Sequence, residues 1–179
     1  NRLTNISKAN IKISCCVDDE QNIININNSA KEKNTSIDLF IEFDCGANRC
    51  GLQSHSEIKN LISLINSLKF VKFVGFQAYN GSIQHIENFV LRKEEVVKTC
   101  NKIKELKNSF KEFSPIITGV GTGCFDLEVS ENIYDEIQVG SYAFMDAHYS
   151  SLKHDNKLNN TNNFENSLFI LASVMSKAL

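Results

Sequence analysis

Residues 37–52, IDLFIEFDCGANRCGL, decide the fold class of this chain. The first seven residues alternate apolar side chains on one face and place Phe40 on the other, which predicts a buried β-strand. A polar loop, DCGANRCG, follows this strand. Ser54 or Ser56 can then cap a helix whose apolar residues recur at helical spacing up to Leu68. A strand, a loop and an amphipathic helix in this order are typical of a parallel α/β sheet.

The neighbouring segments repeat this alternation of strands and helices. On the N-terminal side, a β-prone run at residues 11–17 precedes acidic residues and an isoleucine-bearing helix. On the C-terminal side we expect a strand at 70–78, a helix at about 86–110, and strands at 115–118 and 136–144. The order β-α-β-α-β-α-β-β predicts an α/β fold with a parallel sheet and right-handed crossovers.

The composition argues against several classes of protein. The chain has 179 residues, 42% hydrophobic and 22% charged, which is ordinary for a globular protein. A formal net charge of -2 without a basic tract argues against a nucleic-acid partner. The apolar runs are too short to span a membrane, and no signal peptide opens the sequence. The six cysteines form no Cys-x-x-Cys motif, which favours reduced thiols in a cytoplasmic protein. Cys45-x4-Cys50 alone does not complete a zinc site.

The C-terminal part has a different character. Residues 154–163, HDNKLNNTNN, read as a polar low-complexity linker. Beyond it, residues 168–175, LFILASVM, form one apolar run, and periodicity leaves a helix and a buried strand equally open. This run can open a second domain.

Polar and glycine residues gather where the expected strands end. In open α/β sheets and barrels, ligands bind at that edge. Taken singly, each side chain has an ordinary explanation: a surface arginine, a strand-end tyrosine, a histidine at a helix start. Their occurrence at one edge is what indicates a site. The candidate residues are Arg49, Tyr79, His85, Gly121, Thr122, Gly123, Gly140 and Ser141.

The glycine-rich stretch ITGVGTGC, residues 117–124, is the most unusual of these segments. Its spacing matches neither the dinucleotide fingerprint nor the Walker A loop. Three alternate glycines expose backbone amides that can bind an anion, and a tight turn without a ligand explains them equally well. The hydroxyl group of Thr122 favours the anion slightly.

Four blocks together resemble one family: IEFDCGANRCGL, GFQAYNGSIQH, ITGVGTGCFDLE and EIQVGSYAFMDAHY. They are similar to blocks of the D-threonine aldolase and eukaryotic-type D-serine dehydratase family, which uses pyridoxal 5′-phosphate (PLP) on an alanine racemase-type barrel. The resemblance implies the later strands of a (β/α)8 barrel over residues 1–150. It also implies a linker over 151–164 and the first segment of a C-terminal β domain over 165–179, and thus a strand at 168–175.

The resemblance also assigns roles around the phosphate. The amides of Gly121 and Gly123 and the Thr122 hydroxyl would face the PLP phosphate. The backbone of Gly140 and Ser141 would complete the phosphate site from the next strand.

Three further side chains acquire roles in the same way. Arg49 would approach the phenolic oxygen side of PLP, and Tyr79 would lie near the pyridine nitrogen. A phenol there makes the ring a weaker electron sink than a carboxylate would. His85 matches a histidine near the substrate hydroxyl and is the candidate acid–base residue.

The activity implied for the intact protein is that of a PLP- and metal-dependent lyase on D-configured 3-hydroxy amino acids. An aldolase would release glycine and an aldehyde, and a dehydratase would release a 2-oxo acid and ammonia. A non-catalytic PLP carrier and an inactive fragment are the alternatives, and a homodimer is compatible with the resemblance. The family's Schiff-base lysine would lie before the equivalent of Asn1. Its ligands for Mn, Mg or Zn would lie beyond Leu179, so we expect a central part of an enzyme.

Overall fold

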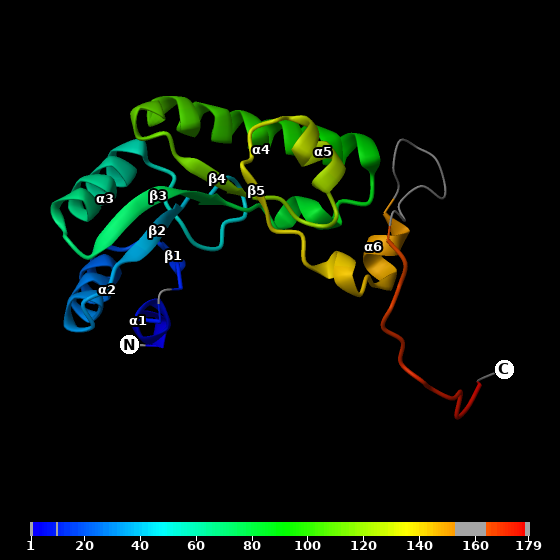
Figure 1. Cartoon of the computed structure of the whole chain (residues 1–179). Coiled ribbons are helices and arrows are strands. Elements are labelled where there is room, and N and C mark those ends of the chain that lie inside the picture. Colours follow the sequence, from blue (N-terminus) through cyan, green and yellow to red (C-terminus); the bar gives the residue numbers. More distant parts are fainter. Residues whose placement is uncertain (1, 10, 153–163, 178–179) are drawn as a thin grey trace.

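A computed structural model describes residues 2–9, 11–152 and 164–177 and contains a five-stranded parallel sheet. The strands lie in chain order, each paired with the next, so the predicted α/β class is confirmed. The sheet is twisted and open (Figure 1). The strands are β1 (Ser14–Val17), β2 (Ile37–Glu42), β3 (Val71–Ala78), β4 (Ile116–Gly119) and β5 (Glu136–Ile137).

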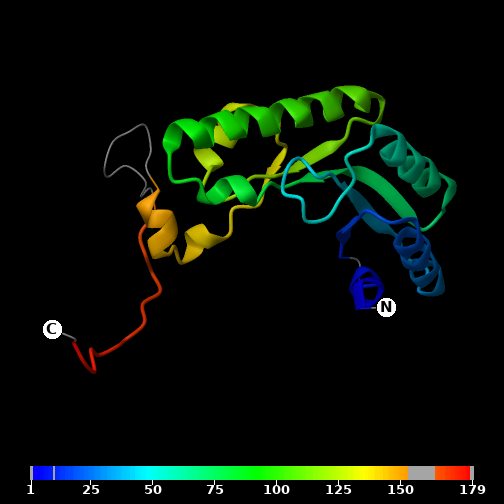
Figure 2. The same cartoon turned by 180° about the vertical axis from the view of Figure 1, so that it is seen from behind.

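Helices connect the strands and follow one side of the sheet (Figures 1 and 2). Side chains of Asp19, Ser54 and Asn88 cap three of them by accepting backbone hydrogen bonds, and Ser54 is one of the two predicted caps. The helices are α1 (Arg2–Ser7), α2 (Glu20–Glu32), α3 (His55–Ser67), α4 (Phe89–Ser109), α5 (Phe125–Ser130) and α6 (Ala147–Ser151). Short 3-10 turns are η1 (Ser82–His85), η2 (Lys111–Phe113) and η3 (Ser141–Ala143).

The core lies between the sheet and these helices. Leu39 and Ile41 of β2 and Phe76 of β3 are fully buried, as are Ile58 and Ile62 on the apolar face of α3. The predicted alternation in β2 therefore places its apolar residues in the core as expected. Removing such side chains from water supplies most of the favourable free energy of folding.

Strands β3 and β4 approach unusually closely at Gly75. A Cβ atom there would lie 2.0 Å from the carbonyl oxygen of Ile116, so only glycine fits. The β2–β3 register also shifts between Leu39 and Phe40, which pair with Phe73 and Gly75. The glycine and the bulge let β3 follow the curvature of the sheet.

Three expectations from the sequence need correction. The strand predicted at 136–144 is only two residues long. Its neighbour β4 ends at Gly119, because the next residue, Val120, takes a φ of +72°. Beyond that point β4 offers no backbone partner to a longer strand. The helix predicted from about residue 86 begins at Phe89, since residues 82–85 form a 3-10 turn and Asn88 caps the helix. Residues 168–175 form no strand: the described segment 164–177 has no hydrogen-bonded partner strand and trails away from the sheet (Figure 1).

The lengths and hydrophobicity of the described helices can be compared with what a membrane span requires. None of their helices is both long enough and apolar enough to cross a bilayer. The predicted linker at 154–163 lies outside the described residues.

Candidate active site

The carboxyl ends of the parallel strands meet at one edge of the sheet, and the segments that follow them form the candidate site. Residues 44–52 follow β2, residues 79–85 follow β3, and residues 120–124 follow β4. Parallel pairing puts all these turns at the same edge because the strands run in one direction. The topology therefore brings together the residues that the sequence singles out.

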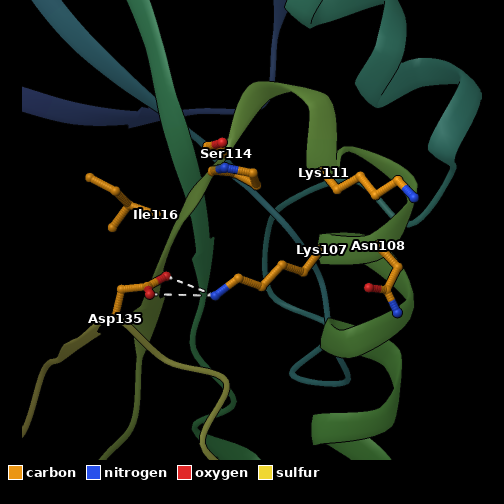
Figure 3. Close-up of a pocket in the computed structure, with 7 residues that line it drawn as sticks. Lys107, Asn108, Lys111, Ser114, Ile116 and Asp135 are labelled. Atoms are coloured by element: carbon orange, nitrogen blue, oxygen red, sulfur yellow. Dashed lines mark hydrogen bonds and ion pairs between the residues drawn. The ribbon is translucent and has the colours of Figure 1, made fainter.

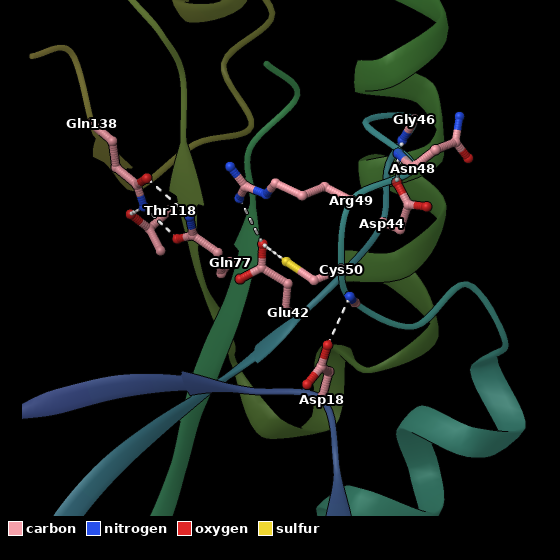
Figure 4. Close-up of polar contacts among 11 residues, drawn as sticks. Asp18, Glu42, Asp44, Gly46, Asn48, Arg49, Cys50, Gln77, Thr118 and Gln138 are labelled. Carbon is pink, nitrogen blue, oxygen red and sulfur yellow. Dashed lines mark hydrogen bonds and ion pairs between the residues drawn. The ribbon is translucent and has the colours of Figure 1, made fainter. Parts of the chain in front are cut away.

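The loop after β2 is folded back and rigidly hydrogen-bonded. Asp44 Oδ1 accepts the amides of Gly46 and Asn48, each over 3.0 Å. The Gly51 amide donates to Asp18 Oδ2 over 2.9 Å (Figure 4). Although burial opposes ionisation, hydrogen bonds from Gln53 and these amides lower the pKa of Asp44. The carboxylate form of Asp44 thus fixes the path of the loop.

This loop presents Arg49 beside Tyr79. The Arg49 guanidinium carbon lies 5.9 Å from the Tyr79 ring centroid, and its Nη2 atom lies 3.4 Å from Glu42 Oε1. Cys50 Sγ also donates to Glu42 Oε1, over 3.5 Å (Figure 4). Burial raises the pKa of Glu42, and the contacts with Cys50 and Arg49 offset part of that rise. The structure therefore brings Arg49 and Tyr79 together and adds Glu42, which the sequence did not indicate.

A row of polar side chains crosses the sheet just below this edge. Glu42, Gln77 and Thr118 are successive Cα partners on β2, β3 and β4. Gln138 exchanges hydrogen bonds with Gln77, and its Nε2 atom donates to Thr118 Oγ1 over 2.8 Å (Figure 4). Polar residues at the end of buried strands are typical of a ligand site rather than of a core.

The turns after β2 and β3 are joined through Asn80. Asn80 Nδ2 donates to Thr99 Oγ1 over 3.0 Å, and Asn80 Oδ1 accepts from the Ser82 hydroxyl over 2.6 Å. The same hydroxyl lies 3.5 Å from the carbonyl oxygen of Gly46. A Cβ atom at Gly46 would lie 3.0 Å from Asn80 Nδ2, so this glycine lets the two turns approach.

The glycine loop is packed against the turn after β3. A Cβ atom at Gly121 would lie 2.5 Å from the Gln84 side chain, and one at Gly123 would lie 2.1 Å from the Gln84 carbonyl oxygen. The Cys124 amide donates to Gln84 Oε1 over 3.1 Å. Close packing therefore accounts for both glycines, whether or not an anion binds.

The amide of Gly121 is already occupied. It donates to Glu128 Oε2 over 3.2 Å, and the phosphate contact that we expected from this amide stays a prediction. In contrast, Thr122 Oγ1 is buried and has no hydrogen-bond partner within the described part of the chain. A buried hydroxyl without a partner costs stability and is what a ligand atom would satisfy.

Glu128 belongs to a buried polar cluster behind the glycine loop. It accepts from Gln84 Nε2 over 3.2 Å and from the Tyr134 hydroxyl over 3.3 Å. Burial raises the pKa of Glu128 to about 7, against the effect of these donors. Burial also raises the pKa of Tyr134. Sequence reasoning missed this cluster; a glutamate between Leu127 and Val129 was the local signal.

His85 ends the 3-10 turn η1 and is exposed beside α6. Its ring centroid lies 4.6 Å from that of His148 and 5.1 Å from that of Tyr149. The stacked Tyr149 ring makes an interplanar angle of 29° with the imidazole. The sequence predicted a role for His85 but not for the tyrosine that contacts it.

Gly140 and Ser141 lie at the start of η3 and are exposed. A Cβ atom at Gly140 would meet nothing within 4 Å, so packing does not require this glycine. Their predicted phosphate contact stays a prediction.

Cysteines and acidic residues do not assemble a metal centre here. Within residues 2–9, 11–152 and 164–177, no three His, Cys, Asp or Glu side chains gather as a ligand set. Burial raises the pKa of Cys45 to about 12, so this thiol is a poor metal ligand.

A separate hollow of about 520 Å³ lies at the opposite end of β4 (Figure 3). Lys107 and Asp135 form an ion pair of 3.1 Å at its wall, and Ile116 begins β4 there. It is therefore distinct from the site at the carboxyl edge.

Comparisons with known proteins agree with this geometry. A sequence model described as "Alanine racemase, N-terminal domain" matches residues 2–148. The chain is 37% identical over 182 residues to a 3-hydroxy-D-aspartate aldolase of Paracoccus denitrificans, covering 99% of this chain and 47% of that relative. It is 36% identical over 173 residues to a D-threonine aldolase of Arthrobacter, covering 93% of this chain and 44% of the relative.

A solved structure is similar to this chain as well. The crystal structure of D-threonine aldolase from Filomicrobium marinum superposes with a TM-score of 0.78 at 26% identity. The match covers 87% of this chain and 42% of that one. The chain thus spans about half the length of the curated relatives it matches.

Proposed function

The chain belongs to the alanine racemase N-terminal domain family, and from this we propose that the intact protein is a PLP-dependent lyase. Its substrates would be D-configured 3-hydroxy amino acids, cleaved in the manner of D-threonine aldolase to glycine and an aldehyde. The identity to two aldolases over almost the whole chain supports this reaction over the dehydratase alternative.

The observation that carries the cofactor assignment is the hydroxyl group of Thr122, which has no hydrogen-bond partner in the described part of the chain. It is buried in a glycine loop at the carboxyl edge of a parallel sheet, where anionic cofactors bind in this class of fold. We assign the PLP phosphate to Thr122 and the Gly123 amide, and to the Gly140–Ser141 backbone. Gly121 shapes the loop, since its amide is held by Glu128.

Arg49 and Tyr79 would flank the cofactor ring. Their 5.9 Å separation and shared edge of the sheet support this arrangement. The ion pair with Glu42 holds Arg49 toward Tyr79, where a guanidinium can donate to the phenolic oxygen of PLP. Bound PLP withdraws electrons from the substrate Cα and so weakens the bonds to that carbon.

His85 would act as the base. Its imidazole can accept the proton of the substrate 3-hydroxyl while the Cα–Cβ bond breaks, and the oxygen becomes the carbonyl of the aldehyde. Its exposure at the edge leaves it accessible to substrate. A divalent metal belongs to the proposal for the intact protein.

The test uses the full-length protein with PLP, first with Mn, Mg or Zn added and then with chelator. D-threonine, D-3-hydroxyaspartate and D-serine are supplied in turn, and glycine, aldehyde, 2-oxo acid and ammonia are measured. Glycine with aldehyde supports the proposal. A 2-oxo acid with ammonia would replace it by the dehydratase, and retained PLP without either product would indicate a carrier.

A further inference from the structure

Tyr149 of α6 lies beside two of the residues that the sequence singled out, His85 and Gly123. Its ring stacks on His85 with a centroid distance of 5.1 Å and an angle of 29°. Its Cε1 atom also lies 3.0 Å from where a Cβ of Gly123 would stand. One aromatic ring therefore lies against both the glycine loop and the imidazole.

The position of Tyr149 is itself fixed. Its backbone amide donates to Asp146 Oδ1 over 2.8 Å, which caps α6. Burial raises the pKa of its phenol, and a hydrogen bond with Ser141 offsets part of that rise. The Tyr149 side chain is thus half-buried and neutral, and the capped backbone of α6 fixes its position.

His148 also lies close to His85, but it is less suited to orient it. Its ring is tilted by 37° against the imidazole, and the side chain is exposed. Tyr149 is less exposed and lies more nearly parallel. Aromatic stacking of this kind stabilises a ring pair beyond what burial of its area provides, and this favours one orientation of a surface ring.

We propose that Tyr149 is a positioning residue that holds the His85 imidazole at a fixed place relative to the glycine loop. The inference rests on the proposed function, in which that loop binds the PLP phosphate and His85 moves a proton. The aromatic ring, not the hydroxyl group, carries this role. Tyr149 acts through His85 and transfers no proton itself.

The experiment compares Tyr149→Phe and Tyr149→Leu in the full-length holoenzyme, with Tyr142→Leu as the matched control. Tyr142 is a tyrosine of the same region whose ring contacts Phe164. We expect Tyr149→Phe and Tyr142→Leu to retain kcat within about twofold. Tyr149→Leu should lower kcat by about tenfold or more, which is part of the roughly 10²–10⁴-fold that a positioned acid–base group contributes.

A double variant separates positioning from general damage. If Tyr149 acts through His85, Tyr149→Leu combined with His85→Ala should be no slower than His85→Ala alone. Losses that multiply would overturn the proposal, as would full turnover of Tyr149→Leu.

A nuclear magnetic resonance measurement keeps the test independent of activity. The His85 ring protons should show cross-relaxation with the Tyr149 ring in the unmodified protein, and a ring-current shift that Tyr149→Phe keeps and Tyr149→Leu loses. Absent cross-relaxation would overturn the proposal even if Tyr149→Leu does not fold. If the His85–Tyr149 ring contact is observed but none of the substrates is turned over, the proposed function is wrong, while the observed contact between the two rings remains valid.

Discussion

The backbone amide of Gly121 donates to Glu128 Oε2 over 3.2 Å, so the glycine loop is tied to a buried carboxyl group on the helix that follows it. The same oxygen accepts from Gln84 Nε2, and Gln84 in turn accepts the Cys124 amide. Loop shape therefore depends on this polar cluster as well as on the glycines. Beside this cluster, the Thr122 hydroxyl group is buried and finds no hydrogen-bond partner among the residues that the structure describes.

Glu128→Gln should make the stability of the protein less dependent on pH. Burial raises the pKa of Glu128 to about 7, above that of a glutamate in the unfolded chain. Its favourable contribution is full below about pH 4 and is lost as pH rises toward 7. As the pH rises from 4 to 8, the difference in unfolding free energy between the two proteins should shift in favour of the variant by on the order of 3 kcal/mol.

Urea unfolding of the full-length protein at several pH values measures this gain. Glu131→Gln is the control, because Glu131 directly follows the same helix but pairs with Lys104 at the surface over 2.7 Å. The prediction would be contradicted if the free energy of unfolding changed with pH in the same way for the parent and for Glu128→Gln.

Thr122→Val should weaken PLP binding while leaving the apoprotein at least as stable. The hydroxyl group is buried without a partner among the described residues, so removing it relieves a penalty of about 1 kcal/mol in the apoprotein. In the holoprotein the same change removes a donor to the phosphate and should raise the Kd for PLP by about tenfold. Equilibrium dialysis and thermal unfolding measure the two effects. Thr99→Val, which takes away the acceptor of Asn80, should instead destabilise the apoprotein.

Gly121→Ala should destabilise the fold with or without cofactor. The added Cβ would lie 2.5 Å from the Gln84 side chain, which is fully buried and cannot yield. Overpacking of this kind costs about 1–3 kcal/mol. Gly140→Ala is the control for stability, since nothing lies within 4 Å of its Cβ position. Equal unfolding midpoints in urea for the two variants would mean that the loop can open without penalty.

His85→Ala should retain PLP but lower turnover by roughly 100-fold, the usual scale for a positioned acid–base group. The imidazole lies at the edge of the site and contributes little to packing, so the variant should fold normally. His55→Ala, which removes a histidine outside the candidate site whose ring contacts Phe110 at 5.8 Å, serves as the control. Cofactor absorbance and steady-state kinetics on the accepted substrates separate binding from turnover. Unchanged kcat would remove His85 from the mechanism.

Periodicity predicted the central part of the fold well, for a physical reason. Strand β2 and helix α3 each bury one continuous set of side chains, so their patterns in sequence are complete. Strand β5 was predicted too long because its length depends on β4, which ends where Val120 adopts a positive φ. A strand's end is thus set by its neighbour, which a local pattern does not contain.

The site was predictable in outline because parallel topology gathers strand ends. Arg49 and Tyr79 do lie together, as expected. Glu128 and Tyr149 were missed, since their roles follow from contacts with residues 7 and 64 positions away, Gly121 and His85. Such contacts exist only after the turns have docked.

The order of the strands also bears on how the chain acquires its structure. In the described part of the chain, each strand pairs with its immediate neighbours in sequence, so each closure spans one crossover connection. Loop-closure entropy therefore stays small at every step, and the sheet can grow in the direction of synthesis. β2 can add to β1 while β4 is still within the ribosome. A defect at Gly75 would stall this growth between β3 and β4 and leave the earlier strands paired.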